Sequence, residues 1–271
     1  MGILHADRGL AARIERSGVR DMEACAISAR DSGVYDDAAL FRVGGGIAAW
    51  YSPDNVLNGS IGLGMNGRVE LEAVVALEAF YRERGARPTV DVCPLADPSL
   101  TMWLAERMFV PLSYENVLVR SIGARQGLPD TSGDVELLIG EDVDRAVWAD
   151  VIARGFTEDE PTAEDHRVAR ASSMCEDSTL FMALVHGSPA GGGMLALDGG
   201  LGHLNADATL PAFRDRGVQH ATIVARLRHA AECGADLVYV ETAPGSGSQR
   251  NMERLGFRVA YTRVTLATPQ R

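Results

Sequence analysis

The stretch from Ala206 to Ala221 constrains the fold of this chain more than any other. It joins a short apolar strand to an amphipathic helix through a basic turn that contains glycine. The amides in the first turn of such a helix have no partners within the helix and lie at the positive end of its dipole. Arg214 and Arg216 flank these amides, and Gly217 lets a ligand come close to the backbone. The pattern favours a phosphate or pyrophosphate, although arginine-rich corners without such a ligand are common.

The elements after this helix follow in a fixed order. Gly234 ends the helix, and Leu237–Thr242 has the composition of a buried strand. A turn-rich loop then enters a short helix over 246–255, which Gly256-Phe257 ends. A last strand over 258–266 alternates apolar and polar residues. The sequence therefore predicts strand, basic turn, helix, strand, helix and strand.

This order resembles the GNAT superfamily of N-acetyltransferases, over about residues 134–268. The stretch Arg214-Asp-Arg-Gly-Val-Gln219 is similar to the Arg/Gln-x-x-Gly-x-Gly/Ala pyrophosphate motif of that family. The Leu-Gly-Phe257 that ends the short helix is the second specific likeness. Gln219 stands where the family usually has a second glycine or alanine, a change that a motif acting through backbone amides tolerates.

An earlier part of the chain repeats the series. Its predicted elements are a helix over 69–84, a strand over 89–93, a helix over 99–108 and a strand over 113–121. Phe109 follows Gly85 by 24 positions, and Phe257 follows Gly234 by 23. Such spacing indicates a repeat, although two unrelated α/β segments can coincide. We therefore expect an α/β (α+β) protein of two GNAT-like mixed-sheet domains in tandem, forming a pseudo-dimer.

The turn-rich stretch 123–133 is the expected linker. It divides the chain into a degenerate GNAT-like domain over 1–123 and an acetyl-CoA-binding catalytic domain over 134–271. Within the second domain, we expect Asp142 and Thr162 to cap the first two helices.

The first domain is expected to be degenerate because its turn lacks the basic character of the second. The turn over 63–68 has one arginine, and Glu70 and Glu72 follow near the start of the next helix. Carboxylates there would repel a pyrophosphate. The glycine run 44–46 has no helix after it, so we expect a hairpin turn and not a phosphate loop.

The resemblance implies where an acyl-CoA would bind. The second domain has predicted strands over 135–139, 179–186, 192–198 and 202–210. Pantetheine would lie beside the fourth of these, where Ala208, Thr209 and Leu210 present backbone groups. The pyrophosphate would lie at the start of the helix, at Arg214, Arg216, Gly217, Val218, Gln219, His220 and Ala221. Ser248 and Asn251 lie where family members often contact pantetheine, or each caps a helix.

Acyl transfer to an amine requires a neutral amine, a stabilised oxyanion and a thiolate that can leave. The family often has a tyrosine five residues before the Phe of Leu-Gly-Phe, and this sequence has Met252 there, which cannot donate a proton. Tyr261 is a candidate acid, or water takes that role. The candidate general bases are His203, Asp207 and Glu241.

Strict alternation along the fourth strand would place four polar residues on one face, namely His203, Asn205, Asp207 and Thr209. Such a row predicts a lined cavity. Alternatively, His203 and Asp207 satisfy each other.

The family usually builds its acceptor pocket at the place of residues 155–175. This segment is acidic, with Glu158, Asp159, Glu160, Glu164 and Asp165. These acidic residues either form a solvated start of a helix, which the helix dipole stabilises, or form a cluster that attracts an amine.

Composition narrows the possible partners. The formal charge is −11, which argues against nucleic-acid binding, and all 26 basic residues are arginine. No run approaches the roughly 20 apolar residues of a membrane span. The cysteines, Cys25, Cys93, Cys175 and Cys233, are widely separated. We therefore expect a cytoplasmic protein with reduced, mostly buried thiols, no metal and no membrane partner.

The resemblance thus implies an N-acyltransferase that moves an acetyl or short acyl group from acyl-CoA to the amine of a small molecule by direct attack. One alternative is a non-catalytic acyl-CoA-binding sensor or scaffold, and another is a protein or peptide N-acetyltransferase. The chain is expected to be a monomer, as a pseudo-dimer, or a homodimer.

Overall fold

The computed structural model describes residues 6–122 and 134–269. The expected linker over 123–133 lies outside the described residues, and the domain boundary placed there stays a prediction. The chain divides into two compact units. The first comprises Met1–Leu118, Glu241–Arg250 and Arg258–Arg271, and the second comprises Val119–Val240 and Asn251–Phe257. None of the helices in the described ranges has the length and hydropathy to span a bilayer.

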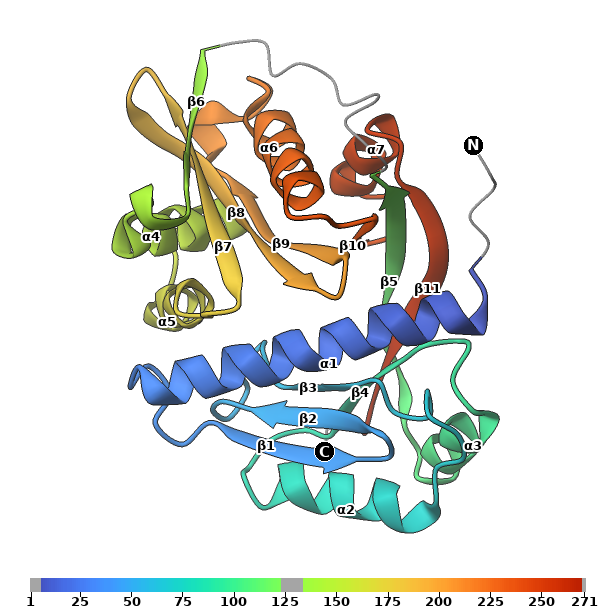
Figure 1. Ribbon diagram of the computed structural model, residues 1–271. Helices are drawn as coiled ribbons and strands as arrows, with labels where there is room; N and C mark the ends of the chain where they lie inside the picture. Colours follow the sequence, from blue (N-terminus) through green and yellow to red (C-terminus); the bar gives the residue numbers. More distant parts are fainter. Residues whose placement is uncertain (1–5, 123–133, 270–271) are drawn as a thin grey trace. The chain divides into compact units, whose positions relative to one another are not determined.

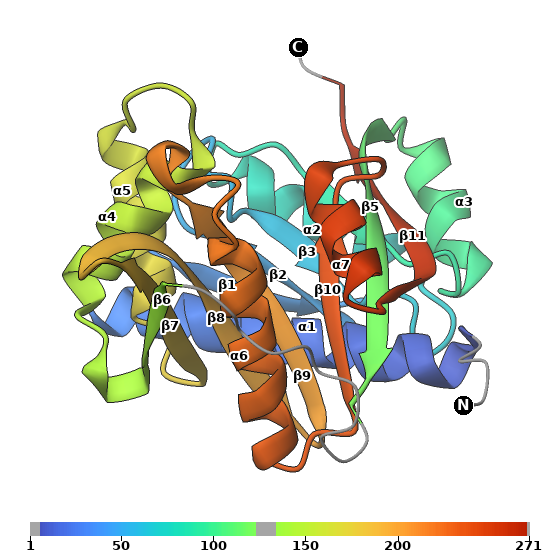
Figure 2. The same cartoon turned by 90° about the horizontal axis from the view of Figure 1, so that it is seen from above.

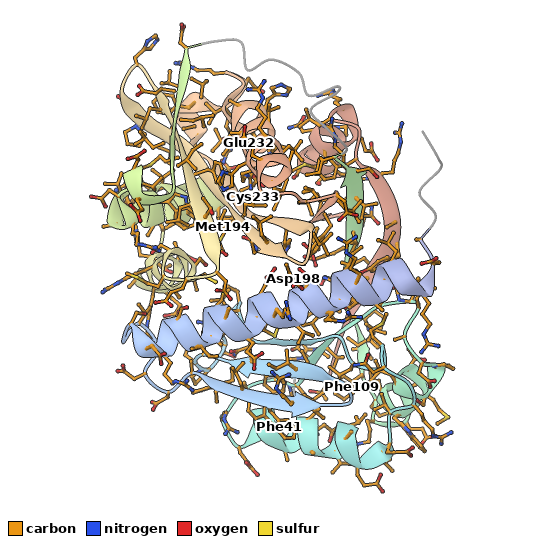
Figure 3. All side chains as sticks on the ribbon, viewed as in Figure 1. Phe41, Phe109, Met194, Asp198, Glu232 and Cys233 are labelled. Carbon is orange, nitrogen blue, oxygen red and sulfur yellow. The ribbon has the colours of Figure 1, made fainter. Side chains whose placement is uncertain are left out.

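The first unit begins with a helix and a small antiparallel sheet. Its elements are α1 (Arg8–Asp31), β1 (Ala39–Val43), β2 (Gly46–Trp50), β3 (Gly59–Ile61) and α2 (Leu71–Arg82). The sheet order is β1-β2-β3, and the β1–β2 turn at Gly44-Gly45 confirms the predicted hairpin. Helices α1 and α2 lie on opposite faces of this sheet (Figure 1). Phe41 of β1, which Figure 3 labels, stacks on Phe80 of α2 with ring centroids 5.5 Å apart.

The first unit also contains the last strand of the chain. Its remaining elements are β4 (Thr89–Val92), α3 (Pro98–Glu106), β5 (Val110–Ser121) and β11 (Arg258–Ala267). β11 lies between β4 and β5, and it runs antiparallel to β4 with Val264 opposite Val92. Val264 and Leu266 thereby join the apolar core to which Leu100 and Leu104 of α3 belong. The C-terminal strand is thus a core element of the unit that holds the N-terminal helix.

The second unit is a mixed sheet covered by helices. Its elements are β6 (Val135–Ile139), α4 (Arg145–Phe156), α5 (Ala163–Ser173), β7 (Ser178–Val185), β8 (Ser188–Asp198), β9 (Leu201–Thr209), α6 (Val218–Glu232), β10 (Leu237–Thr242) and α7 (Gly247–Arg254). β10 and α7 also contribute residues to the first unit. The order is β5-β10-β9-β8-β7-β6, in which β10 is parallel to β9 and β6 to β9 are antiparallel neighbours. Helix α6 packs on one face, and α4 packs on the other with α5 beside it (Figures 1 and 2).

The bounds of most predicted helices and strands are confirmed within two or three residues. The predicted cap at Asp142 and the predicted state of two cysteines are wrong. Asp142 lies in a 3₁₀ turn, and α4 is instead capped by Asp144, whose carboxylate accepts from the amides of Ala146 and Val147. The prediction of reduced thiols is wrong for Cys25 and Cys175, which are disulfide-bonded. Cys93 and Cys233 are free, and only Cys93 of these two is buried.

A buried ionic network centres on Arg263 of β11. Its guanidinium donates to Glu15 of α1 at 2.9 and 3.2 Å and to Glu241 at 3.1 Å. Tyr261 donates its hydroxyl proton to the same Glu15 oxygen at 2.7 Å, and burial raises the pKa of this tyrosine. Arg263 and Glu15 are 4% and 0% exposed, so neither charge has water as an alternative partner.

Removing Arg263 should therefore destabilise the protein strongly. We expect Arg263→Met to lower the free energy of unfolding by about 3–5 kcal/mol, because Glu15 would keep a buried charge without its cation. Urea denaturation measures this. The control is Arg30→Met, which removes an exposed pair with Asp31 and should change stability by less than about 1 kcal/mol. Equal effects of the two substitutions would contradict a special role for Arg263.

A second prediction concerns pH. Burial raises the pKa of Asp91 in β4, although Arg263 and the hydroxyl of Thr265, which donates to its carboxylate at 2.6 Å, oppose the shift. The folded state thus binds this proton more tightly than the unfolded state. Its favourable contribution is present below the ordinary aspartate pKa of about 3.9 and is lost as pH rises through the folded pKa. We expect the stability of the natural protein relative to Asp91→Asn to fall as pH rises from about 4. Urea titrations at several pH values measure it, and a difference that grows with pH would contradict the shift.

Candidate functional site

Strands β9 and β10 part after a short parallel contact. Leu201 to His203 pair with Leu237 to Tyr239, and the His203 ring stacks on Tyr239 at 4.2 Å and 7°. From Leu204 to Thr209, β9 pairs with β8 and with no second strand among the described residues. One edge of β9 therefore presents backbone groups to which another extended chain can hydrogen-bond.

A β-bulge lies on this open stretch of β9. Asn205 is opposite Met194 and Ala208 is opposite Gly192, so Ala206 and Asp207 together face the single residue Gly193. Ala206 has a φ of +52°, a left-handed conformation that costs an alanine roughly 1–2 kcal/mol.

The bulge interrupts the alternation expected from the sequence. A methyl group on Gly202 would meet Ala230 of α6, so His203 faces away from α6, and its Nδ1 lies 3.3 Å from Asn205 Nδ2. Asp207 instead faces α6, where Arg226 donates to its carboxylate. The predicted single row of four polar side chains is therefore wrong, as is the pairing of His203 with Asp207.

The start of α6 is open to an anion. Gly217 is the N-cap with a φ of +76°, and no side chain caps the helix. Ala221 donates its amide to the Gly217 carbonyl at 2.9 Å, so this amide is not available to a ligand. The first-turn amides of Val218, Gln219 and His220 have no acceptor within the helix.

The two arginines of the turn have different surroundings. Arg214 donates to Glu158 at 2.6 Å, which occupies one carboxylate of the acidic segment. Arg216 lies over the ring of Phe213, 5.6 Å from its centroid.

The acidic segment also contains a helix cap. Asp165 forms a capping box with Thr162 at the start of α5, which confirms the cap predicted for Thr162, and these hydrogen bonds lower the pKa of Asp165.

The substitution at Gln219 has a structural partner. Its side-chain oxygen accepts from Asn251 Nδ2 at 2.7 Å, which joins α6 to α7. Ser248 lies one turn before Asn251 in α7 and is half-buried. The structure thus brings together Gln219 and Asn251, two of the residues implied to bind the cofactor.

No protein-family model and no curated protein sequence matches the chain. A GCN5-related N-acetyltransferase from Kribbella flavida matches in structure at a TM-score of 0.65 and 16% identity, over 92% of this chain and 96% of that one. A tandem GNAT protein from the clavulanic acid biosynthesis pathway, solved without AcCoA, matches at a TM-score of 0.61 and 14% identity, over 86% and 85%. The fold is that of tandem GNAT proteins. At these identities the likeness extends to the fold alone.

The second GNAT half differs from expectation at several candidate residues. Leu210 donates its amide to Ala190 of β8 at 2.9 Å, and N–H groups alternate along a strand, so of the three strand residues Thr209 directs its N–H to the open edge. Tyr261 and Glu241 belong to the Arg263 network of the first unit. Met252, at the position of the usual tyrosine, is fully buried.

The corresponding turn of the first GNAT half is filled by its own residues. A methyl group on Gly64 would lie 3.3 Å from Ala96 and from the amide of the next residue. Val69, just before α2, donates its amide to Ser99 Oγ at 2.8 Å and accepts from the Trp103 indole at 3.0 Å. These contacts hold the turn against α3, although α2, like α6, has no side-chain cap. No group of three potential metal ligands is found in the described parts of either half.

Sequence reasoning gave no role to Gly193 and Arg226, which meet at the bulge. The one signal available was the glycine run 191–193 in β8, because glycine inside a strand marks a bulge or a close backbone approach.

The left-handed residue in the bulge gives a stability test. We expect Ala206→Gly to raise the free energy of unfolding by about 0.5–1 kcal/mol, because glycine adopts a positive φ without steric cost. Urea denaturation measures this. In the matched control Ala208→Gly, two positions along the same strand at a residue without a positive φ, stability should fall by about 0.5–1 kcal/mol. A loss in both variants would contradict the strained conformation of Ala206.

Proposed function

We propose that this chain is an N-acyltransferase that transfers an acetyl or short acyl group from acyl-CoA to the amine of a small molecule, with its site in the second half. The open edge of β9 beyond His203 carries this proposal. An extended pantetheine arm has amide groups that match such an edge. The tandem GNAT fold and the uncapped start of α6 support the same assignment.

The residues at the start of α6 fit the pyrophosphate of CoA. Val218, Gln219 and His220 offer the free amides, and Gly217 leaves the approach open because nothing lies within 4 Å of a methyl group placed there. Arg216 is the arginine that we assign to the phosphate charge, because Arg214 already pairs with Glu158. Asn251 would contact the pantetheine arm while bonded to Gln219.

The proposed chemistry is direct attack of a neutral amine on the thioester carbonyl. The backbone N–H of Thr209 would stabilise the oxyanion, because N–H groups alternate along a strand and Leu210 already donates to Ala190 of β8. Of the four candidate acids and bases, Asp207 pairs with Arg226, and Glu241 and Tyr261 bond within the Arg263 network. We propose His203 as the base because it is the last residue of β9 before the open edge.

The Asn205 amide can orient His203 for this role. Asn205 Oδ1 is buried and has no hydrogen-bond partner among the described residues, whereas Nδ2 lies against His203 Nδ1. Amide oxygen and nitrogen have nearly the same shape. In the flipped orientation Oδ1 accepts from Nδ1–H, and Nε2 is then the ring nitrogen that would take the proton of the amine. Water would protonate the leaving thiolate, because Met252 cannot.

The acceptor class rests on charge. The net charge of −11 favours a cationic small amine over nucleic acid. Glu158 and Asp165 have partners of their own, so the acidic segment is in part a structural feature. We propose a cytoplasmic monomer, as a pseudo-dimer, or a homodimer, without a metal or a membrane partner.

One observation favours a second candidate, a non-catalytic acyl-CoA-binding sensor or scaffold. Met252 is buried at the position where the family often has its proton donor, so this chain has no such acid there. The two candidates share the binding site and differ in turnover.

Calorimetric titration with acetyl-CoA tests the binding site. We expect one site per chain, because the turn before α6 carries Arg214 and Arg216, whereas Glu70 and Glu72 stand at the start of α2 and would repel a pyrophosphate. Arg216→Glu should abolish binding, since a carboxylate would oppose the phosphates. The matched control Arg68→Glu changes an exposed arginine, paired with Glu70, in the turn of the first half and should leave binding unchanged.

The opposite pattern of the two variants would assign the active site to the first half. Two sites per chain would show that the first half is not degenerate. Binding without turnover across a panel of amines would select the sensor. No binding by the folded natural protein would contradict both candidates.

A further inference from the structure

Arg226 is a fully buried arginine of α6 whose donors converge on the bulge. Its Nη1 donates to the carbonyls of Met194 at 3.2 Å and Asn205 at 3.4 Å, which belong to β8 and β9. Nη2 donates to the carboxylate of Asp207, and Nε donates to the Thr222 carbonyl at 3.2 Å. One side chain therefore joins α6 to the backbone of both strands at the irregular point of their ladder.

The opposite strand is shaped to admit this guanidinium. A methyl group on Gly193 would lie 2.6 Å from Arg226 Nη1 and 2.7 Å from Cζ, closer than carbon and nitrogen atoms approach. Gly193 is the single residue opposite Ala206 and Asp207. Figure 3 labels its neighbour Met194 on β8, beside α6. Any side chain larger than hydrogen at Gly193 would displace the guanidinium from the bulge.

The bulge decides which residues follow on the open edge. With it, Ala208 pairs with Gly192; in a regular ladder continuing from Asn205 and Met194, Asp207 would take that place. A one-residue shift reverses the direction of every later group of the strand. Ala208 and Thr209 would then present different atoms to the open edge of β9.

We propose that Arg226 is a positioning residue of the acyl-CoA site, which keeps the bulge of β9 in place and thereby aligns the backbone of Ala208 and Thr209 with the thioester end of the ligand. This inference rests on the proposed function. The phosphate end of the ligand is bound at the start of α6, about two turns earlier, by amides that do not depend on the bulge. Loss of the Arg226 contact therefore affects the two ends of the ligand differently.

The test compares two ligands in two variants of the full chain. Gly193→Ala displaces the guanidinium and keeps its charge, and Arg226→Lys keeps the charge and loses the planar fork. Calorimetry with acetyl-CoA and with 3′-phosphoadenosine 5′-diphosphate, the nucleotide part of CoA with its pyrophosphate, gives dissociation constants for the whole ligand and for its phosphate end. We expect acetyl-CoA binding to weaken by about tenfold to a hundredfold, because a small misplacement of positioned groups has effects of that size. Nucleotide binding should stay within about twofold.

Two control variants make the same kinds of substitution, glycine to alanine and arginine to lysine, away from the bulge. Gly59→Ala adds a methyl group to a strand glycine of β3 whose nearest neighbour would be Met22 at 4.0 Å. Arg107→Lys alters the forked pair of Arg107 with buried Glu78. Neither should change the affinity for either ligand.

Selective loss of acetyl-CoA affinity supports the inference. Equal loss for both ligands would reduce Arg226 to a stabilising residue of the fold, and unchanged acetyl-CoA affinity in Gly193→Ala would also overturn the inference. Should Arg226→Lys not fold, Gly193→Ala decides. A folded natural protein that binds neither ligand would overturn the proposed function itself, and the inference with it, so the first titration separates the two failures.

Discussion

The buried contact between Arg263 and Glu15 holds together two segments that lie 248 positions apart. Strand β11 cannot take its place between β4 and β5 without carrying Arg263 into the core, and that charge is tolerated only because Glu15 and Glu241 accept its hydrogen bonds. Tyr261 belongs to the same network, because its hydroxyl donates to the Glu15 oxygen that accepts from Arg263. The first unit is therefore completed by the last strand of the chain, and residues that follow the basic turn and α6 in sequence form part of its core.

The same fold gives different outcomes at its two helix-entry turns. In the first half, Gly64 packs closely on Ala96, and the backbone of Val69 is bonded to Ser99 and Trp103. In the second half, Gly217 has open space around it. The difference lies in which residues pack against the turn before each helix. Residues of α3 pack on the first turn at Gly64, whereas the second is open at Gly217; α2 and α6 alike have no side-chain cap.

The candidate site was predicted from sequence as far as local chemistry determines it. Periodicity gave β9, α6 and β10 within one or two residues, and glycine with arginine marked the turn. The cap at Asp144 in place of Asp142 was missed because both aspartates stand near the start of α4, and the backbone path alone decides which one reaches the amides. The face of Asp207 was missed because alternation assumes a regular ladder. One extra residue at Ala206 reverses the alternation of side chains between the two faces of β9, and no residue type in β9 predicts that insertion.

The sequence by itself determined the elements, their order, their repetition and the basic turn, because these follow from hydrophobic periodicity and from the conformational demands of glycine. Only the tertiary structure decided that Asp207 meets Arg226, that Glu241 and Tyr261 bond to the Arg263 network, and that Gly193 makes room for a guanidinium. The physical reason is the cost of burying charge. A buried arginine must find acceptors wherever the packing places them, and those acceptors lie as many as 32 positions away for Arg226 and as many as 248 away for Arg263.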